Sequence, residues 1–267
     1  MNPEKINPPD YLLQVLDLKT YFPIRRGLLR RTIGYIKAVD GVSIALKAGR
    51  TFGLVGESGS GKTTLARSIL RLVPVHQGRI VFRQTDVLSA DKTHLRQLRR
   101  QIGLIFQDPY ASLNPRQTIG NIIGEGLKVH RLTTDRDLPD RVTTWLSRVG
   151  LLPDYINRYP HEFSAGQRQR IALARTLALQ PSLIICDEPV SSLDVSTQAQ
   201  ILNLLKDLQV QFSLTYLFIA HDLTVVESFC DVVAVMYKGR IVECAPTRQL
   251  FENPTHTYTQ ILIASAR

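Results

Sequence analysis

Residues 56–63 read Gly56-Glu57-Ser58-Gly59-Ser60-Gly61-Lys62-Thr63 and match the pattern G-x-x-x-x-G-K-[ST] at every fixed position. Glycines allow backbone N–H groups to converge on phosphate oxygens without a Cβ in the way. A helix that begins at Lys62 would direct its positive end at the same point. The Lys62 ammonium can reach the β- and γ-phosphates, and the Thr63 hydroxyl can bind Mg²⁺. The stretch predicts a nucleotide-binding loop, whose expected contact residues are Gly56, Glu57, Ser58, Gly59, Ser60, Gly61, Lys62, Thr63 and Thr64.

The segments that flank this loop have the pattern that such a loop requires. Residues 51–55 form a short apolar run typical of a buried strand. Residues 64–72 place Leu65, Ile69 and Leu72 on one face of a helix, and Pro74 would end that helix. Because a strand precedes the loop and a helix follows it, a chance glycine-rich turn is a poor explanation.

A second apolar run, residues 183–186, leads directly into two adjacent acids, Asp187 and Glu188. The carboxyl ends of strands in an α/β sheet are where ligands bind, so both carboxylates would lie at such an edge. Asp187 would hold Mg²⁺, as in a Walker B element. Glu188 would polarise the attacking water as a general base. Alone the pair is also compatible with solvated acids at the end of a strand; beside the phosphate loop it predicts nucleotide hydrolysis.

The rest of the chain alternates strand and helix patterns around a helical block. Strands are expected at residues 12–18, 102–106 and 214–220, a strand pair across 36–46 after a basic irregular stretch that ends near residue 35, and a hairpin from 232–235 with 240–243. Helices are expected at residues 166–179 and 196–210, within the block 118–160, and twice at the C-terminus. This order predicts an α/β core (residues 11–106 and 181–245), an inserted helical subdomain (about 107–180) and a C-terminal helical extension (246–267).

Composition narrows the class of protein. No stretch of the 267 residues reaches the roughly 18–20 apolar residues of a membrane-spanning helix. Residues 1–10 lack the apolar core of a signal peptide, so we expect a cytoplasmic chain. The three cysteines are scattered and have no metal-binding spacing. The net charge of +10 favours an anionic partner such as a nucleotide, a nucleic acid or a membrane surface.

A third motif separates this chain from other proteins with a phosphate loop. Phe163-Ser164-Ala165-Gly166-Gln167 resembles the ABC signature LSGGQ and stands just before the strand that ends in Asp187. Further elements follow in the order of that family. Gln107 resembles the glutamine of the Q-loop, Ser191-Ser192-Leu193-Asp194 resembles the D-loop, and His221 resembles the switch histidine. The chain therefore resembles the ABC ATPases over most of its length.

This resemblance implies a fold, two ligands and a mechanism. The fold would be an ABC-type α/β core with a mixed sheet, a helical subdomain and an antiparallel β subdomain. Two ATPase domains would dimerise head to tail around two ATP molecules with Mg²⁺, each held by one phosphate loop and the opposing signature. The residues expected on the opposing ATP are Ser164, Ala165, Gly166, Gln167 and Asp194. The expected catalytic residues are Glu188, His221 and Gln107, and the expected Mg²⁺ ligands are Thr63, Gln107 and Asp187.

Two features of the resemblance leave alternatives open. Ala165 stands where the signature has a glycine, and its methyl group either crowds the γ-phosphate or is tolerated because Gly166 is retained. The adenine base would stack on an aromatic ring. Phe22 fits the position of the family's aromatic best, and Tyr21 and Tyr35 compete with it because the basic stretch makes the alignment ambiguous.

Finer similarities concern a subfamily. The segments 55–62, 106–109, 112–116 and 253–259 resemble ATPases of oligopeptide, dipeptide and nickel importers. That subfamily pairs two different ATPases, one of which carries a C-terminal cysteine cluster; this chain resembles the other. The resemblance implies a homologous but non-identical second ATPase, two transmembrane permease subunits and an extracytoplasmic substrate-binding protein. It places the chain peripherally on the cytoplasmic face of the membrane, and no nucleic acid is expected.

Two other functions compete with the importer. A soluble ABC ATPase that acts on nucleic acid would explain the charge of +10. The zinc modules, long coiled coils and paired cassettes of such proteins are not found in this sequence. An ABC exporter would share the ATPase motifs, and only the subfamily resemblance argues against it. Between peptides and nickel chelates as cargo, the sequence favours peptides slightly.

Overall fold

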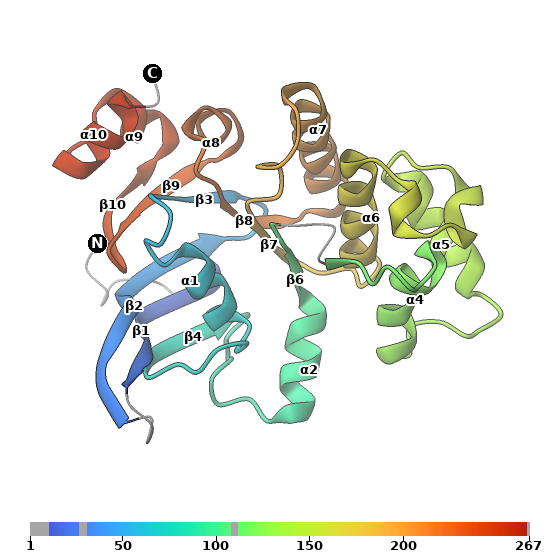
Figure 1. Ribbon diagram of the computed structural model, residues 1–267, viewed down its shortest axis with the longest axis horizontal. Coiled ribbons are helices and arrows are strands. Elements are labelled where there is room, and N and C mark those ends of the chain that lie inside the picture. The colour runs from blue at the N-terminus through green and yellow to red at the C-terminus, as the bar shows by residue number, and fades with distance from the viewer. Residues whose placement is uncertain (1–10, 27–30, 108–111, 266–267) are drawn as a thin grey trace. The chain divides into compact units, whose positions relative to one another are not determined.

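The computed structural model describes residues 11–26, 31–107 and 112–265 (Figure 1). The chain forms two compact units, one from residues 1–96 and 215–267 and the other from residues 97–214. The helix α2 (Lys92–Gln101) contains the point at which the chain passes from the first unit to the second.

The first unit contains an antiparallel sheet with the strand order β2-β1-β4-β5. Its strands are β1 (Tyr11–Arg26), β2 (Arg31–Lys47), β4 (Gln77–Phe82) and β5 (Thr85–Asp86). β1 pairs with β2 along its whole length and with β4 on its other side. Alternate side chains of β1, such as Leu13 and Val15, are fully buried, which places one face of this sheet in the core.

The described part of the same unit also contains strands in the order β10-β9-β3-β8, of which β3 and β8 lead into candidate site residues. Their bounds are β3 (Thr51–Val55), β8 (Thr215–Ile219), β9 (Val232–Tyr237) and β10 (Arg240–Pro246). β3 pairs in parallel with both β8 and β9, and β9 pairs antiparallel with β10. Every residue of β3 and β8 is buried, as expected for parallel strands covered on both faces.

Besides the start of α2, the described part of the first unit contains the helices α1 (Lys62–Ile69), α8 (Leu223–Phe229), α9 (Thr247–Glu252) and α10 (Thr257–Ala264). The helix α1 directly follows the phosphate loop and buries Leu65 and Ile69. Leu72 was expected on the same buried face, and this expectation is wrong, because α1 ends at Ile69 and Leu72 is 48% exposed.

The second unit contains two parallel strands and a set of helices. The strands are β6 (Ile102–Ile105) and β7 (Leu183–Asp187). The helices are α4 (Ile119–Val129), α5 (Leu138–Arg148), η3 (Pro153–Asn157), η4 (Pro160–Glu162), α6 (Ala165–Leu177) and α7 (Val195–Phe212). Trp145 of α5 packs against Phe212 of α7 with ring centroids 5.6 Å apart, and Arg148 lies 4.5 Å from the centroid of the Trp145 ring.

The α/β class predicted from the sequence is confirmed, and one local expectation is wrong. The basic irregular stretch and the strand pair across residues 36–46 are in fact two long paired strands, because β1 continues to Arg26 and β2 starts at Arg31. Of the segment 106–109, which resembles the importer ATPases, residues 108 and 109 lie outside the described residues. Within the described residues, none of the helices is long and apolar enough to cross a membrane.

Candidate functional site

The phosphate loop and His221 follow two neighbouring strands of the first unit. β3 and β8 are parallel, with Leu54 opposite Ile219, and the Ala220 N–H donates to the Leu54 carbonyl. Their carboxyl ends therefore lie at the same edge, where α/β sheets bind ligands. Gly56 follows β3 by one residue and His221 follows β8 by two, and the His221 side chain is exposed.

Two glycines of the loop are required by close approaches of other backbone segments. Gly56 has a φ of +147° and Gly61 a φ of +110°, a region that favours glycine. A Cβ on Gly56 would overlap the carbonyl oxygen of Met236, and one on Gly61 would overlap that of Ala38. By contrast, a Cβ on Gly59 would meet nothing within 4 Å. Other backbone segments therefore pack closely against both ends of the loop, whereas there is open space next to Gly59 at its crest, the turn between Glu57 and Ser60.

Lys62 is the buried cation of this loop. Lys62 is only 5% exposed. Its Nζ donates hydrogen bonds to the Gly56 carbonyl at 2.7 Å and to the Glu57 carbonyl at 2.8 Å. Nζ also lies 3.4 Å from Ser60 Oγ. An ammonium held by loop carbonyls is fixed at the place where phosphate oxygens would compete for it. Thr63 and Thr64, the next residues of α1, are half-buried.

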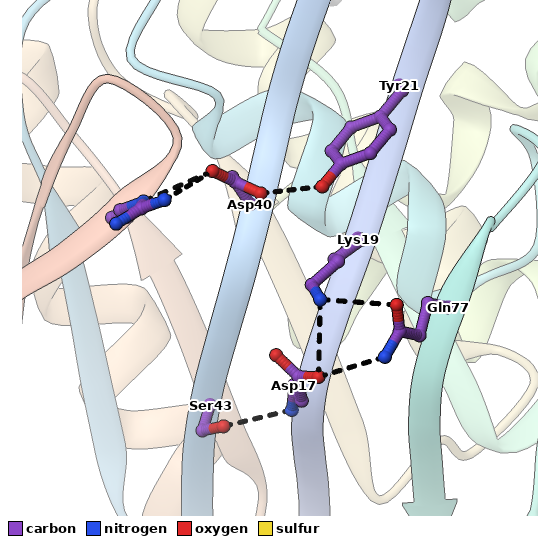
Figure 2. A network of polar contacts seen from close by, with 7 residues as sticks. Asp17, Lys19, Tyr21, Asp40, Ser43 and Gln77 are labelled. Carbon is purple, nitrogen blue, oxygen red and sulfur yellow. Dashed lines mark hydrogen bonds and ion pairs between the residues drawn. The ribbon is translucent and has the colours of Figure 1, made fainter.

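The three aromatic candidates for adenine stacking differ in their surroundings. Figure 2 shows the Tyr21 hydroxyl pointing to Asp40, to which it donates at 2.6 Å. The Tyr21 ring also lies 5.4 Å from His76, and Tyr35 is 55% exposed. Phe22 is half-buried and two residues from Thr20, whose hydroxyl bonds to Ser68 of α1 at 2.9 Å. Since side chains alternate along a strand, Phe22 lies on the face that Thr20 directs to α1.

The candidate catalytic pair of the second unit is in direct contact. β6 and β7 are parallel, with Ile105 opposite Cys186, so Gln107 and Glu188 leave the sheet at the same edge. The Gln107 amide nitrogen donates to Glu188 Oε2 at 2.9 Å. Asp187 is 5% exposed, whereas Glu188 is half-buried. The arrangement holds the carboxylate expected to act as general base in a defined orientation.

Glu188 also has an unusual backbone. Its φ of +51° lies in the left-handed region, which costs a side-chain-bearing residue about 1–2 kcal/mol. The Glu188 carbonyl accepts a hydrogen bond from Ser191 Oγ at 3.1 Å, which helps to hold this turn. Residues kept in such conformations gather at functional sites. Since eight other described non-glycine residues also have a positive φ, the case for Glu188 rests on its contact with Gln107 and its place directly after β7.

The signature-like segment forms the start of α6. Ser164 Oγ accepts from the Gln167 N–H at 3.3 Å, and Gln167 Oε1 accepts from the Ser164 N–H at 3.0 Å. This capping box fixes the first turn, whose N–H groups and positive dipole end favour an anion. Ala165, the first residue of α6, is half-buried.

Asp194 and Gly166 are linked through a residue that sequence reasoning did not single out, Thr197. Asp194 is the N-cap of α7 and accepts from the Thr197 N–H at 2.9 Å and from its hydroxyl at 2.7 Å. These bonds hold the pKa of Asp194 below its usual value. A Cβ on Gly166 would overlap Thr197 Cγ2. Asp194 thus fixes the side chain against which the signature glycine packs.

Tyr258 is a second residue that sequence reasoning missed as part of the site. It stands in the segment 253–259, the tail motif, 201 positions after Glu57. Its hydroxyl accepts a hydrogen bond from the Glu57 N–H at 3.1 Å. No spacing rule could have signalled this pairing, because it depends on how α10 lies against the strands of the first unit.

The side chains expected to hold Mg²⁺ fit that ion by their chemistry. Thr63, Asp187 and Gln107 offer a hydroxyl, a carboxylate and an amide oxygen, and Mg²⁺ prefers such oxygen ligands. Because the Gln107 amide nitrogen is engaged with Glu188, its amide oxygen is the atom left to act as a ligand. Thr63 belongs to the first unit, and Asp187 and Gln107 belong to the second.

Comparison with known protein families and sequences gives consistent matches. The family described as "ABC transporter" matches residues 39–191, more than half of the chain. The "Oligopeptide transport ATP-binding protein AppF" of Bacillus subtilis is 52% identical over 255 residues, which cover 95% of this chain and 78% of AppF. The "Glutathione import ATP-binding protein GsiA" of Escherichia coli K12 is 56% identical over 256 residues, which cover 95% of this chain and 41% of GsiA. The chain thus spans less than half the length of GsiA.

Solved structures of similar fold agree with these matches. CbiO1 from Clostridium perfringens, described as part of the ABC transporter complex cbiONQ, has a TM-score of 0.76 and 27% identity and covers 91% of this chain. That alignment includes 92% of the CbiO1 chain. The ATP-binding cassette MJ0796, solved as a dimer with ADP and phosphate, has a TM-score of 0.78 and 26% identity, covering 88% of this chain and 99% of its own.

Proposed function

The chain belongs to the ABC transporter family and is an ABC-type ATPase, and from this premise we propose that it energises the import of peptides through membrane permeases. The observation that carries the proposal is the phosphate loop around the buried Lys62, in a chain 52% identical to an oligopeptide transport ATP-binding protein. The names of the two relatives above refer to oligopeptides and to glutathione, itself a small peptide. We therefore propose peptides, and not nickel chelates, as the cargo.

In the proposed reaction the first unit binds the nucleotide. The N–H groups of residues 56–64 and the Lys62 ammonium hold the phosphates, and Phe22 stacks on the adenine. Thr63, Asp187 and Gln107 would hold Mg²⁺, which when bound neutralises charge on the β- and γ-phosphate oxygens. His221, at the end of β8, donates a hydrogen bond to the γ-phosphate.

Hydrolysis is assigned to the second unit. The Glu188 carboxylate takes a proton from the attacking water, and Gln107, bonded to it at 2.9 Å, holds it in place. General-base assistance of this kind contributes about 10²–10⁴ in rate. Two chains would close head to tail, so that the first turn of α6 in one chain approaches the γ-phosphate bound by the other. Ser164, Ala165, Gly166, Gln167 and Asp194 are the proposed residues of that contact.

The proposed assembly follows from the importer class. The partners would be a homologous but non-identical ATPase, two transmembrane permeases and an extracytoplasmic binding protein that selects the peptide. The chain would lie peripherally on the cytoplasmic face of the membrane. The dimer reported for MJ0796 is an example of two ABC cassettes associating.

The test is affinity purification of the tagged chain from gently solubilised membranes. We expect two permeases and a second ATPase to copurify, and we expect the ATPase rate of this complex in vesicles to rise when a peptide-loaded binding protein is added. Lys62→Ala serves as the inactive control. Copurification of nucleic acid without any permease would contradict the importer and favour the soluble ABC ATPase.

A further inference from the structure

The tail motif at residues 253–259 has no part in the reaction proposed above, yet it is fixed to the strands that border the phosphate loop. The Glu243 carboxylate of β10 accepts hydrogen bonds from Thr255 N at 2.8 Å, Thr255 Oγ1 at 2.9 Å and His256 N at 2.9 Å. His256 is the N-cap of α10, and its Nδ1 accepts from the Tyr258 N–H at 3.1 Å. Thr259 is fully buried. The first turn of α10 is therefore anchored, which gives Tyr258 a defined direction.

The Tyr258 side chain is held by a second tyrosine. Its ring lies on the ring of Tyr237, the last residue of β9, with centroids 4.2 Å apart and planes inclined by 33°. Such pairs add about 0.5–1.5 kcal/mol beyond the area they bury. Burial raises the pKa of Tyr258, so its hydroxyl stays protonated at neutral pH. The packing sets the position of the hydroxyl, which is the atom that meets the phosphate loop.

The Tyr258 hydroxyl and Lys62 Nζ contact the same peptide unit, the one that joins Gly56 to Glu57, because the Gly56 carbonyl accepts from Nζ at 2.7 Å. The Glu57 N–H donates to Tyr258 Oη at 3.1 Å, and the Glu57 carbonyl accepts from Lys62 Nζ at 2.8 Å. The Glu57 carbonyl also accepts from the Ser60 N–H at 3.1 Å. One residue therefore joins the tail to the cation of the loop and to the loop's own turn.

A neighbouring contact holds the other side of the turn. The Gly239 N–H, two residues after Tyr237, donates to the Ser60 carbonyl at 2.9 Å, and the Gly239 carbonyl accepts from Asp40 N at 2.8 Å. The crest between Glu57 and Ser60 is thus supported at both of its ends, while Gly59 has open space around it. Removing the Tyr258 hydroxyl would free the Gly56–Glu57 peptide to rotate and would disturb the Gly56 carbonyl, which holds Lys62 Nζ at 2.7 Å.

We propose that Tyr258 is a positioning residue for ATP binding, whose hydroxyl holds the Glu57 peptide so that the phosphate loop is ordered before the nucleotide arrives. Ordering a loop during binding reduces affinity, and a loop ordered in advance avoids that cost. The proposal rests on the proposed function, because ATP is the ligand whose binding it concerns. It assigns the C-terminal helix a role in nucleotide affinity and none in the chemical step.

The experiment compares Tyr258→Phe with the unchanged chain. Phenylalanine keeps the ring on Tyr237 and removes only the hydroxyl. Titration with a fluorescent ATP analogue should show a Kd that rises between about 2- and 10-fold, the range expected for one hydrogen bond. In the purified transport complex, the KM for ATP should rise by the same factor, and kcat should change less than twofold. Hydrogen exchange of the Glu57 amide should become faster, and the thermal midpoint should stay close to that of the unchanged chain.

Three comparisons decide the outcome. Tyr11→Phe removes a hydroxyl at the start of β1 and should leave the Kd unchanged; a matching rise there would overturn the proposal. Tyr258→Ala should raise the Kd at least as much as Tyr258→Phe; if only alanine has an effect, ring packing and not the hydroxyl supports the loop, and the proposal is wrong. Wild-type affinity in Tyr258→Phe together with lost binding in Lys62→Ala would overturn the role of Tyr258 alone. Wild-type affinity in Lys62→Ala would overturn the nucleotide site itself.

Discussion

Glu188 has a left-handed backbone and a carboxylate that accepts a hydrogen bond from the Gln107 amide nitrogen at 2.9 Å. Glu188→Gln keeps the size of the side chain and removes the proton acceptor. We expect ATP turnover of the purified complex to fall by about 10²–10⁴ while ATP binding persists. A single-turnover assay with radiolabelled ATP measures this.

Glu227→Gln provides a matched control for that substitution. Glu227 lies on the exposed side of α8, and its change to glutamine should leave the turnover rate as it was. If Glu188→Gln hydrolyses ATP at the wild-type rate, Glu188 is not the general base. The left-handed backbone of Glu188 would then not be explained by catalysis.

Gly166 has a steric reason to be glycine that is independent of any nucleotide. A methyl group there would overlap Thr197 Cγ2, and Thr197 cannot easily rotate because Asp194 holds both its N–H and its hydroxyl. We expect Gly166→Ala to lower the free energy of unfolding by about 1–3 kcal/mol, the usual cost of overpacking. Urea unfolding followed by circular dichroism measures this.

Ala165→Gly, one position earlier, is the natural comparison. It removes a methyl group from the half-buried first residue of α6, so its cost should not exceed about 1 kcal/mol, the difference between glycine and alanine in a helix. A Gly166→Ala protein more stable than the unchanged chain would show that α6 and α7 adjust without strain.

At the scale of elements, the fully buried strands were predictable from sequence, whereas the exposed start of β2 was not. β3 and β7 bury every residue, and a continuous apolar run reveals such strands. The first seven residues of β2, Arg31–Lys37, are exposed or half-buried on both faces, so no alternation of apolar and polar residues signals a strand there. α2 buries only Leu98, and its apolar residues are limited to Leu95 and Leu98, too few to signal a helix by periodicity. Pairing with β1, and not local pattern, makes the start of β2 a strand.

The candidate site also contains some features that were predictable from the sequence and others that were not. Contiguous motifs such as residues 56–63 were identified from sequence because a single backbone turn needs all their residues. Contacts between distant segments were not: Tyr258 with Glu57, Thr197 with Gly166 and Arg240 with Asp40 each depend on packing that no local pattern encodes. In each of these pairs the two residues come from segments far apart in the sequence.

Asp40 links β2 to β10 and to β1, and this link should depend on pH. Its carboxylate accepts from Tyr21 at 2.6 Å and from Arg240 at 2.7 Å (Figure 2). The Tyr21 hydroxyl first, then Arg240, lowers the pKa of Asp40 from 3.8 to about 2. A lowered folded-state pKa stabilises the protein above the unfolded value, and this stabilisation is lost as pH falls from about 4 to about 2.

Asp40→Asn removes the titrating group from this link. At pH 7 the midpoint of urea unfolding should therefore be lower in Asp40→Asn than in the unchanged chain. The difference between the two midpoints should become smaller as the pH falls from 4 to 2.5. A difference that stays constant down to pH 2.5 would show that the charge of Asp40 does not contribute.

At the scale of the whole molecule, the proposed mechanism requires the phosphate loop and the signature of one chain to serve different ATP molecules. Ser164→Asp tests this division. Aspartate caps a helix as well as serine does, so α6 should start as before. Its carboxylate would nevertheless repel the γ-phosphate of an opposing nucleotide. The Kd of the isolated Ser164→Asp chain for ATP should stay within twofold of that of the unchanged chain. The purified complex that contains the variant should lose most of its ATPase activity.

Two further variants complete the argument. Lys62→Ala should weaken ATP binding already in the isolated chain, because the lysine acts on the chain's own nucleotide. Thr118→Asp makes the same kind of change at the N-cap of α4, where Thr118 Oγ1 accepts from the Asn121 N–H, and should leave the ATPase rate of the complex unaltered. If Ser164→Asp weakened ATP binding in the isolated chain as much as Lys62→Ala does, the signature would act on its own chain's nucleotide. The head-to-tail pairing would then be wrong, because each site would be complete within one chain.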